Sequence, residues 1–325
     1  MLEKFFKLSE NHTDAKTEIL AGITTFMTMA YILAVNPSIM ATTGMDSGAV
    51  FTATALAAFI GTLLMAIFAN YPFALAPGMG LNAYFAYTVV IGMGYTWQYA
   101  LTAVFAEGII FILLSLTNVR EAIFNAIPMN LKSAVSVGIG LFIAFVGLQN
   151  AHIVVGGSTL LQLFSVDAYN KANGVEASFN NVGITVILAL AGIIITGILV
   201  VKNIKGNILW GILITWGLGI ICQFAGLYVP NADLGFYSLL PDFSKGLSIP
   251  SLTPIFGKLQ FKGIFSVDFI VILFAFLFVD LFDTIGTLVG VSAKADMLDE
   301  EGKLPHIKGA LLADAVATTF GAILG

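Results

Sequence analysis

Charged side chains are scarce in this sequence: only 10% of its 325 residues are Asp, Glu, Lys or Arg, whereas 58% are hydrophobic. A soluble domain carries about 25% charged residues, so this chain lacks the polar surface that a soluble globule of its size needs. A lipid bilayer accepts such a composition, and the mean hydropathy of +0.95 agrees with it. We therefore expect an all-α polytopic membrane protein surrounded by membrane lipid.

Cysteine and chemical motifs are also nearly absent. The one cysteine, Cys222, excludes an intrachain disulfide and a cysteine-based metal cluster. The sequence shows no phosphate-binding loop, serine-hydrolase motif, redox motif or His/Glu spacing typical of a metal site. We therefore expect no enzyme activity, no metal, no other cofactor and no nucleic-acid partner. Residues 1–18 lack the apolar core of a cleavable signal peptide, so the first span is expected to direct membrane targeting.

Apolar windows separated by charged or Pro/Gly-rich segments predict nine membrane spans. Two of these windows, 75–91 and 133–148, are shorter than the roughly 20 residues of a full crossing. Two connections, 149–181 and 229–266, are long. The nine windows are 18–36, 49–69, 75–91, 97–117, 133–148, 182–201, 207–228, 267–290 and 308–325.

The positive charges favour a cytoplasmic N-terminus. With nine spans in that orientation, ten of the 14 Lys and Arg residues fall in inner segments, Arg120 among them. The other four lie in the two long outer connections, where the positive-inside rule is weak. We therefore expect a multi-pass protein of the cell membrane whose N-terminus is cytoplasmic.

Two aspartates interrupt the apolar window at 267–290. In FLFVDLFDTIGTLVG, Asp280, Asp283 and Thr284 are separated by spacings of three and four residues. Thr287 follows one turn later on the same helical face. A mid-helix aspartate costs about 2.5–3.5 kcal/mol on membrane-insertion scales, so intramembrane acids usually face a cavity or a partner. We predict a polar stripe that meets a ligand in mid-membrane; protonated packing residues are the alternative.

Three further polar residues inside predicted spans each allow two interpretations. Glu107 could support a site or proton coupling, or it could cap the backbone of a neighbouring helix. Asp314 could belong to the site or could hold the 267–290 helix in place. Thr25 could contact a ligand or join two helices. No basic residue lies deep in a predicted span, which argues against a site for anions.

The window at 75–91 is typical of a broken helix. PFALAPGMGLNAYFAY has two prolines and two glycines within nine residues, followed by Asn82 and a helix-like run. Irregular backbone at membrane depth is tolerated where it lines a cavity, and discontinuous helices carry substrate sites in secondary transporters. Asn82 and Phe85 suit a flat, hydrogen-bonding solute. A kink for close helix packing is the alternative.

Four segments together resemble a known family: VDLFDTIGTLVG, APGMGLNAYFAY, AGITTFMTMAYILAVNP and LLADAVATTFGAILG. They are similar to the purine permeases for hypoxanthine, guanine and adenine. These form the azaguanine-sensitive branch of the nucleobase–cation symporter-2 (nucleobase–ascorbate transporter, xanthine/uracil permease) family, and the similarity covers about residues 1–325. The resemblance implies an inverted-repeat (7+7) transporter fold with helices three and ten broken, and a homodimer. It implies one transmembrane transporter domain, with a first repeat at about 17–228 and the start of a second at about 264–325.

The resemblance also implies roles for residues that match the family motifs. Asp283 falls on the acidic position that hydrogen-bonds the base, and Asp280 is the additional acid typical of this branch. Asn82 matches an asparagine near the substrate, and Asp314 matches an acid that supports the site. The family continues into a tenth helix whose glutamate also binds the base. We therefore expect this sequence, which stops at Gly325, to be a fragment that does not transport by itself.

We expect the parent protein to import purine nucleobases (guanine, hypoxanthine or adenine) by secondary active transport, with H⁺ as the coupling ion. An anion transporter of the same architecture for sulfate- or carboxylate-type solutes, and a membrane module that does not transport, are the alternatives. The predicted substrate-binding residues are Asp283, Asp280, Asn82, Phe85 and Thr284, and the predicted supporting or proton-coupling residues are Asp314, Glu107 and Thr25.

Overall fold

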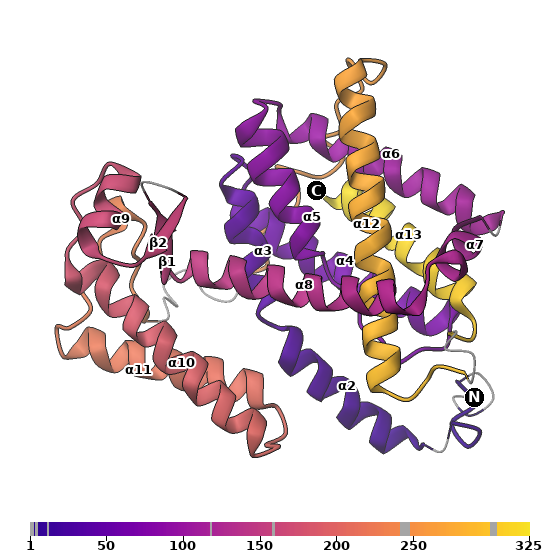
Figure 1. Cartoon of the computed structure of the whole chain (residues 1–325), viewed down its shortest axis with the longest axis horizontal. Coiled ribbons are helices and arrows are strands. Elements are labelled where there is room, and N and C mark those ends of the chain that lie inside the picture. The colour runs from indigo at the N-terminus through magenta and orange to yellow at the C-terminus, as the bar shows by residue number, and fades with distance from the viewer. Residues whose placement is uncertain are drawn as a thin grey trace. The chain divides into compact units, whose positions relative to one another are not determined.

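The structure is a computed structural model of the chain, and its described residues divide into two compact units (Figure 1). The first unit comprises residues 1–22, 29–142 and 249–325, and the second comprises 23–28 and 143–248. Lys4, Lys245 and Lys303, which entered the charge count above, lie outside the described residues. The described residues are 3, 6–11, 13–117, 119–157, 160–240, 248–299 and 304–325.

Helices build the first unit, and two of them, α2 and α8, extend into the residues of the second. In chain order its elements are α2 (Ala15–Met29), α3 (Ile32–Ala41), α4 (Ser47–Phe68), α5 (Met79–Ala83), the π-helix η1 (Tyr84–Gly92), α6 (Trp97–Leu116), α7 (Val119–Ala126), α8 (Met129–Asn150), α12 (Val267–Lys294) and α13 (Ile307–Leu324).

The membrane-spanning helices follow the apolar windows of the sequence. Within the described residues, eight helices are long and apolar enough to cross a membrane, and they coincide with eight of the nine predicted windows. The prediction of a short crossing at 133–148 is wrong, because α8 is 22 residues long. Its backbone remains helical through the polar Asn130 and Lys132 before the apolar run and through Gln149 after it.

The ninth window, 75–91, contains a broken helix, as its prolines and glycines predict. Residues 70–78 are not helical, and a continuous helix then runs from Met79 to Gly92. Thr62 of α4 supports the non-helical part, because its Oγ1 accepts a hydrogen bond from the Leu75 N–H at 3.0 Å. A side chain thus satisfies backbone that has no helical partner at membrane depth.

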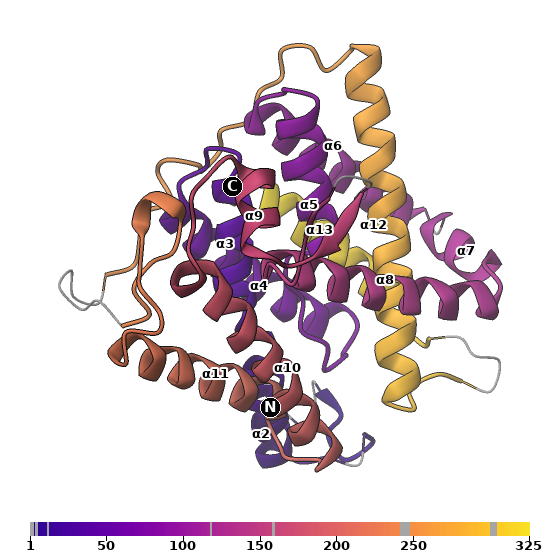
Figure 2. The ribbon, with the colours of Figure 1, turned by 60° about the vertical axis from the view of Figure 1, so that its left-hand side comes forward.

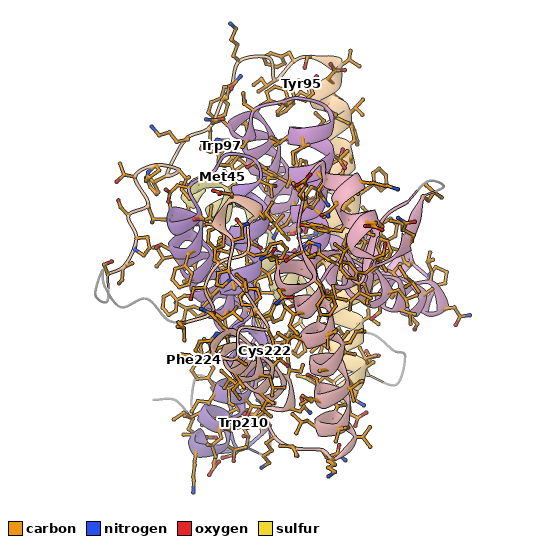
Figure 3. The ribbon with its side chains drawn as sticks, turned by 90° about the vertical axis from the view of Figure 1, so that its left-hand side faces the viewer. Met45, Tyr95, Trp97, Trp210, Cys222 and Phe224 are labelled. Atoms are coloured by element: carbon orange, nitrogen blue, oxygen red, sulfur yellow. The ribbon has the colours of Figure 1, made fainter. Side chains whose placement is uncertain are left out.

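Close helix packing fixes the core of the first unit. α13 lies against α6 and α4, and Figure 1 shows α12 running beside α6. Gly108 of α6 leaves no room for a Cβ, because the Thr319 side chain of α13 fills that space. Figure 3 shows Met45, Tyr95 and Trp97 near one end of the unit, where the two aromatic residues pack against the buried cluster that contains Met45. These contacts pack α6 closely against α13.

The second unit consists of a helical hairpin and a small mixed segment. Its helices α10 and α11 lie side by side (Figure 2), and Gly192 contacts Thr215 across their interface while Gly211 contacts Thr196. Its elements are the antiparallel strands β1 (Val154–Gly156) and β2 (Leu161–Leu163), α9 (Val166–Asn173), the π-helix η2 (Phe179–Gly183), α10 (Ile184–Val201), α11 (Asn207–Phe224) and the 3₁₀ turn η3 (Ala232–Leu234).

Candidate functional site

The polar stripe of α12 is only partly directed into the protein. Asp280 and Thr284 are buried, at 4% and 8% exposure, and Asp283 is half-buried. Thr287, one turn further on, is exposed, so the prediction that it shares the inward-facing stripe is wrong. Seven residues at 100° each bring Thr287 to within about 20° of the direction of Asp280, so its exposure goes with its position two turns further along α12 and not with a rotation of the face. The two aspartates and Thr284 therefore define the polar part of α12 inside the unit.

The Asp283 side chain of α12 lies beside the first turn of the broken helix. A Cβ added to Gly78 would stand 2.8 Å from the Asp283 Oδ2, so the carboxyl occupies the space beside that glycine. Gly78 is the residue that precedes the first turn of α5, and that turn has no side-chain cap. The first N–H groups of a helix have no partner within the helix and attract negative charge. Asp283 and this helix start thus place an acceptor and several donors next to each other.

Arg120, at the start of α7, is buried among the acids of α12 and α13. Its exposure is 0%, and its Nη2 lies 2.7 Å from the Asp314 Oδ2 and 3.5 Å from the Asp280 Oδ2. Its Nη1 donates to the Leu311 carbonyl oxygen at 2.8 Å, and its Cζ lies 4.0 Å from the centre of the Phe111 ring. One guanidinium therefore joins α6, α7, α12 and α13. Arg120 lies between two spans, as the sequence predicts, but its side chain is buried among the helices.

Asp314 and Thr284 complete the contacts of this arginine. The Thr284 hydroxyl donates to the Asp314 Oδ2 at 2.9 Å and accepts from the Arg120 Nη2 at 3.3 Å. Of the two interpretations of Asp314, the structure favours the one in which it holds α12 in place, because it links α13 to α12 through a side chain on each helix. Thr284 likewise contacts protein groups on other helices.

Glu107, on α6, is buried at 0% exposure, and its carboxyl lies within hydrogen-bonding reach of the Asp280 carboxyl. Within the described residues, neither Glu107 oxygen accepts a hydrogen bond from an N–H or O–H group. The alternative interpretation, in which Glu107 caps a neighbouring backbone, therefore has no support. Glu107, Asp280 and Asp314 form an acidic cluster around Arg120, and we call these four residues the charge cluster.

Asn82 of α5 belongs to a buried chain of hydrogen bonds. Its Nδ2 donates to the Asn36 Oδ1 at 2.6 Å, and the Asn36 Nδ2 donates to the Thr54 Oγ1 at 2.7 Å. The Thr54 hydroxyl in turn donates to the Val50 carbonyl oxygen at 2.7 Å. This chain fixes the first turn of the broken helix to α3 and α4. Asn36 is a residue that the sequence interpretation missed.

Phe85 and Thr25, two further predicted residues, make contacts of other kinds. Phe85 is 4% exposed and packs in the core, with its ring 6.5 Å from that of Phe276. Tyr84, its neighbour, is partly accessible and meets Phe276 edge-to-face at 5.0 Å. Thr25 lies in the part of α2 that belongs to the second unit, where its carbonyl oxygen accepts from the Thr28 hydroxyl at 2.8 Å. The roles predicted for Phe85 and Thr25 remain predictions.

Arg120 is the most important residue that the sequence interpretation missed, and one signal could have found it. It is the sole arginine of the sequence, whose other 13 positive side chains are lysines. Arginine is preferred over lysine where one cation must hold several acceptors in a buried site. Its charge is matched by Asp280 and Asp314, so its burial does not by itself create a site for anions.

Comparison with known proteins places these residues in a family context. The sequence profile of the Permease family matches residues 16–325. The protein MJ0326 of Methanocaldococcus jannaschii is 47% identical over 325 residues, which is 100% of this chain and 68% of that protein. The guanine/hypoxanthine permease PbuO of Bacillus subtilis is 43% identical over 323 residues, or 98% of this chain and 68% of that protein. The adenine permease AdeP of Escherichia coli is 37% identical over 326 residues, or 100% of this chain and 66% of that protein.

Proposed function

The chain belongs to the Permease family, and we propose that the protein of which it forms part imports purine nucleobases across the cell membrane. The family consists of transporters rather than enzymes, and the relatives named for guanine, hypoxanthine and adenine support the choice of substrate class. The resemblance described above adds the expectation of two inverted repeats and of a homodimer. We further propose a cytoplasmic N-terminus and proton symport.

The observation that carries this proposal is the position of Asp283 beside Gly78 at the start of the broken helix. A purine presents ring N–H groups next to ring nitrogen or carbonyl acceptors along one edge. A carboxylate accepts from the N–H groups, while helix N–H groups donate to the acceptors. Asp283 is half-buried, which suits a group that must exchange water for a ligand. We assign to Asp283 the role of substrate acceptor.

In this proposal, three other predicted residues hold the helices of the site in place. Asn82 orients the broken helix through Asn36, and Thr284 and Asp314 secure α12 through Arg120. Asp280 is more deeply buried than Asp283 and contacts Arg120, so we assign it to the coupling machinery, as the partner of Arg120, and not to substrate binding. An anion carrier is the less favoured alternative, because the buried cation near the site already has two carboxylate partners.

Uptake by cells that express the full-length gene tests the proposal. Radiolabelled guanine, hypoxanthine, adenine, xanthine and uracil are supplied at several pH values, with and without a protonophore. We expect purine uptake that the protonophore abolishes and that Asp283→Asn reduces at least tenfold. Asp268→Asn is the matched control, since this exposed aspartate lies on the same helix and binds only the Tyr95 hydroxyl among the described contacts. Uptake of sulfate or a carboxylate, or of no solute, would contradict the proposal.

A further inference from the structure

Among the described ion pairs, Glu107 is the one acid of the charge cluster that forms none with Arg120. Arg120 contacts Asp314 at 2.7 Å and Asp280 at 3.5 Å, and it also donates hydrogen bonds to Thr284 and the Leu311 carbonyl. Glu107 faces Asp280, with 0% exposure to solvent. The titratable groups that act on it are Asp280 of α12, Asp314 of α13 and Arg120 of α7. Within the described part of the chain, no N–H or O–H group donates to either oxygen of this buried carboxyl.

The proximity of the Glu107 and Asp280 carboxyl groups determines which of the two carries a proton. Two buried carboxylates in contact cannot both be ionised, because each would lack a donor and would repel the other. Arg120 stabilises the negative charge on Asp280, which is the nearer of the two to the guanidinium. The proton therefore belongs to Glu107, whose O–H can donate to the Asp280 carboxylate.

We infer that Glu107 is the residue that binds and releases the coupling proton, with Arg120 as a positioning residue that keeps Asp280 ionised. This inference rests on the proposed function. On one side of the membrane a proton adds to the Glu107 carboxylate, and on the other side the same O–H bond gives up that proton to water. Asp283 stays free to accept from the substrate throughout. Proton binding and substrate binding thus occur on different carboxyl groups, linked through α12.

Accumulation driven by a pH gradient measures this role directly. Vesicles containing the full-length protein are given a gradient of one pH unit, with the membrane potential held at zero. One proton per substrate then supports about tenfold accumulation, because one pH unit and a tenfold concentration ratio store the same free energy. We expect wild-type vesicles to concentrate labelled guanine about tenfold and Glu107→Gln vesicles to reach only equal concentrations inside and outside. Exchange of labelled for unlabelled guanine, which needs no net proton movement, should stay within about threefold of wild type.

Two control variants make the outcomes distinct. Glu107→Asp keeps an ionisable group and should accumulate guanine with an altered pH midpoint, so it also serves as a test if Glu107→Gln does not fold. Asp268→Asn removes an exposed carboxyl from α12 and should behave as wild type. Gradient-driven accumulation by folded Glu107→Gln, or an unchanged pH profile in Glu107→Asp, would overturn the inference alone. A wild-type protein that neither exchanges nor accumulates any purine would overturn the proposed function and the inference with it.

Discussion

The buried arginine offers the sharpest test of how the helices of the first unit are held together. Arg120→Gln removes the positive charge and most of the donors while leaving a polar side chain of similar length. Asp280 and Asp314 would then lie inside the protein without their counter-charge, and the Leu311 carbonyl would lose its donor. We expect a marked loss of stability, because α7, α12 and α13 all depend on this one side chain.

The magnitude follows from the contacts that are lost. Breaking a buried ion pair by removing one partner costs about 3–5 kcal/mol. A hydrogen bond to a charged group contributes about 1.5–3 kcal/mol, but such contributions are not additive within one network. We therefore expect Arg120→Gln to lower the free energy of unfolding by about 4 kcal/mol. The shift is about 2–4 °C per kcal/mol for 150–250 residues and smaller for longer chains, so the melting temperature should fall by about 8 °C or less.

Thermal unfolding of the full-length protein in detergent, followed by size-exclusion chromatography with fluorescence detection, measures this change. Arg120→Lys keeps the charge but not the forked geometry, so we expect about half of the loss. The double variant Arg120→Gln/Asp314→Asn removes one uncompensated acid and should recover part of the stability. Lys171→Gln, at an exposed position, is the control and should leave the melting temperature unchanged. A shift below about 2 °C for Arg120→Gln, or a double variant less stable than the single one, would refute the reasoning.

Two further predictions concern the broken helix and the second unit. Gly78→Ala places a Cβ 2.8 Å from the Asp283 Oδ2, so it should weaken guanine binding at least tenfold in an equilibrium binding assay. Gly80→Ala is the control and should bind guanine normally, because the nearest described atom to its Cβ is 3.7 Å away. Equal losses of affinity in both variants would contradict the assigned position of the carboxyl. Burial against aromatic rings lowers the pKa of His152 from its ordinary 6.5. The unfolded chain therefore binds more protons than the folded chain at mildly acidic pH. The free energy of unfolding should fall as the pH drops below about 6.5 and level off below the folded-state pKa. Melting curves from pH 8 to pH 5 should depend less on pH in His152→Gln than in the wild type, and identical pH dependence in the two proteins would exclude the effect.

Much of the fold follows from simple patterns in the sequence. Apolar runs of about 20 residues mark the crossing helices because lipid requires an apolar surface and internally satisfied backbone. The prolines and glycines before Asn82 mark the broken helix, since proline lacks an N–H group and glycine tolerates close approach. The spacing of Asp280, Asp283 and Thr284 identifies an inward-facing polar sector. These features are local, so a single segment is enough to read them.

The charge cluster could not be read in the same way. Its four members come from α6, α7, α12 and α13, and nothing within one segment shows which side chains meet. Hydropathy assigns Arg120 to a loop because it lies between two apolar windows, whereas tertiary packing buries it. Asn36 was missed for the same reason, because its partner Asn82 lies 46 residues away. Helical periodicity gives the direction of Thr287 but not its burial, which depends on whether another segment covers that turn of α12.

Equilibrium binding of labelled guanine to the purified full-length protein tests the central claim most directly, because it isolates the substrate site from coupling and from expression in cells. The account predicts saturable binding by the wild type and by Asp268→Asn, competition by hypoxanthine or adenine, and a loss of at least tenfold in affinity for Asp283→Asn. Unchanged affinity in a folded Asp283→Asn protein would contradict the assignment of this carboxyl, beside Gly78 at the start of the broken helix, as the group that accepts the purine.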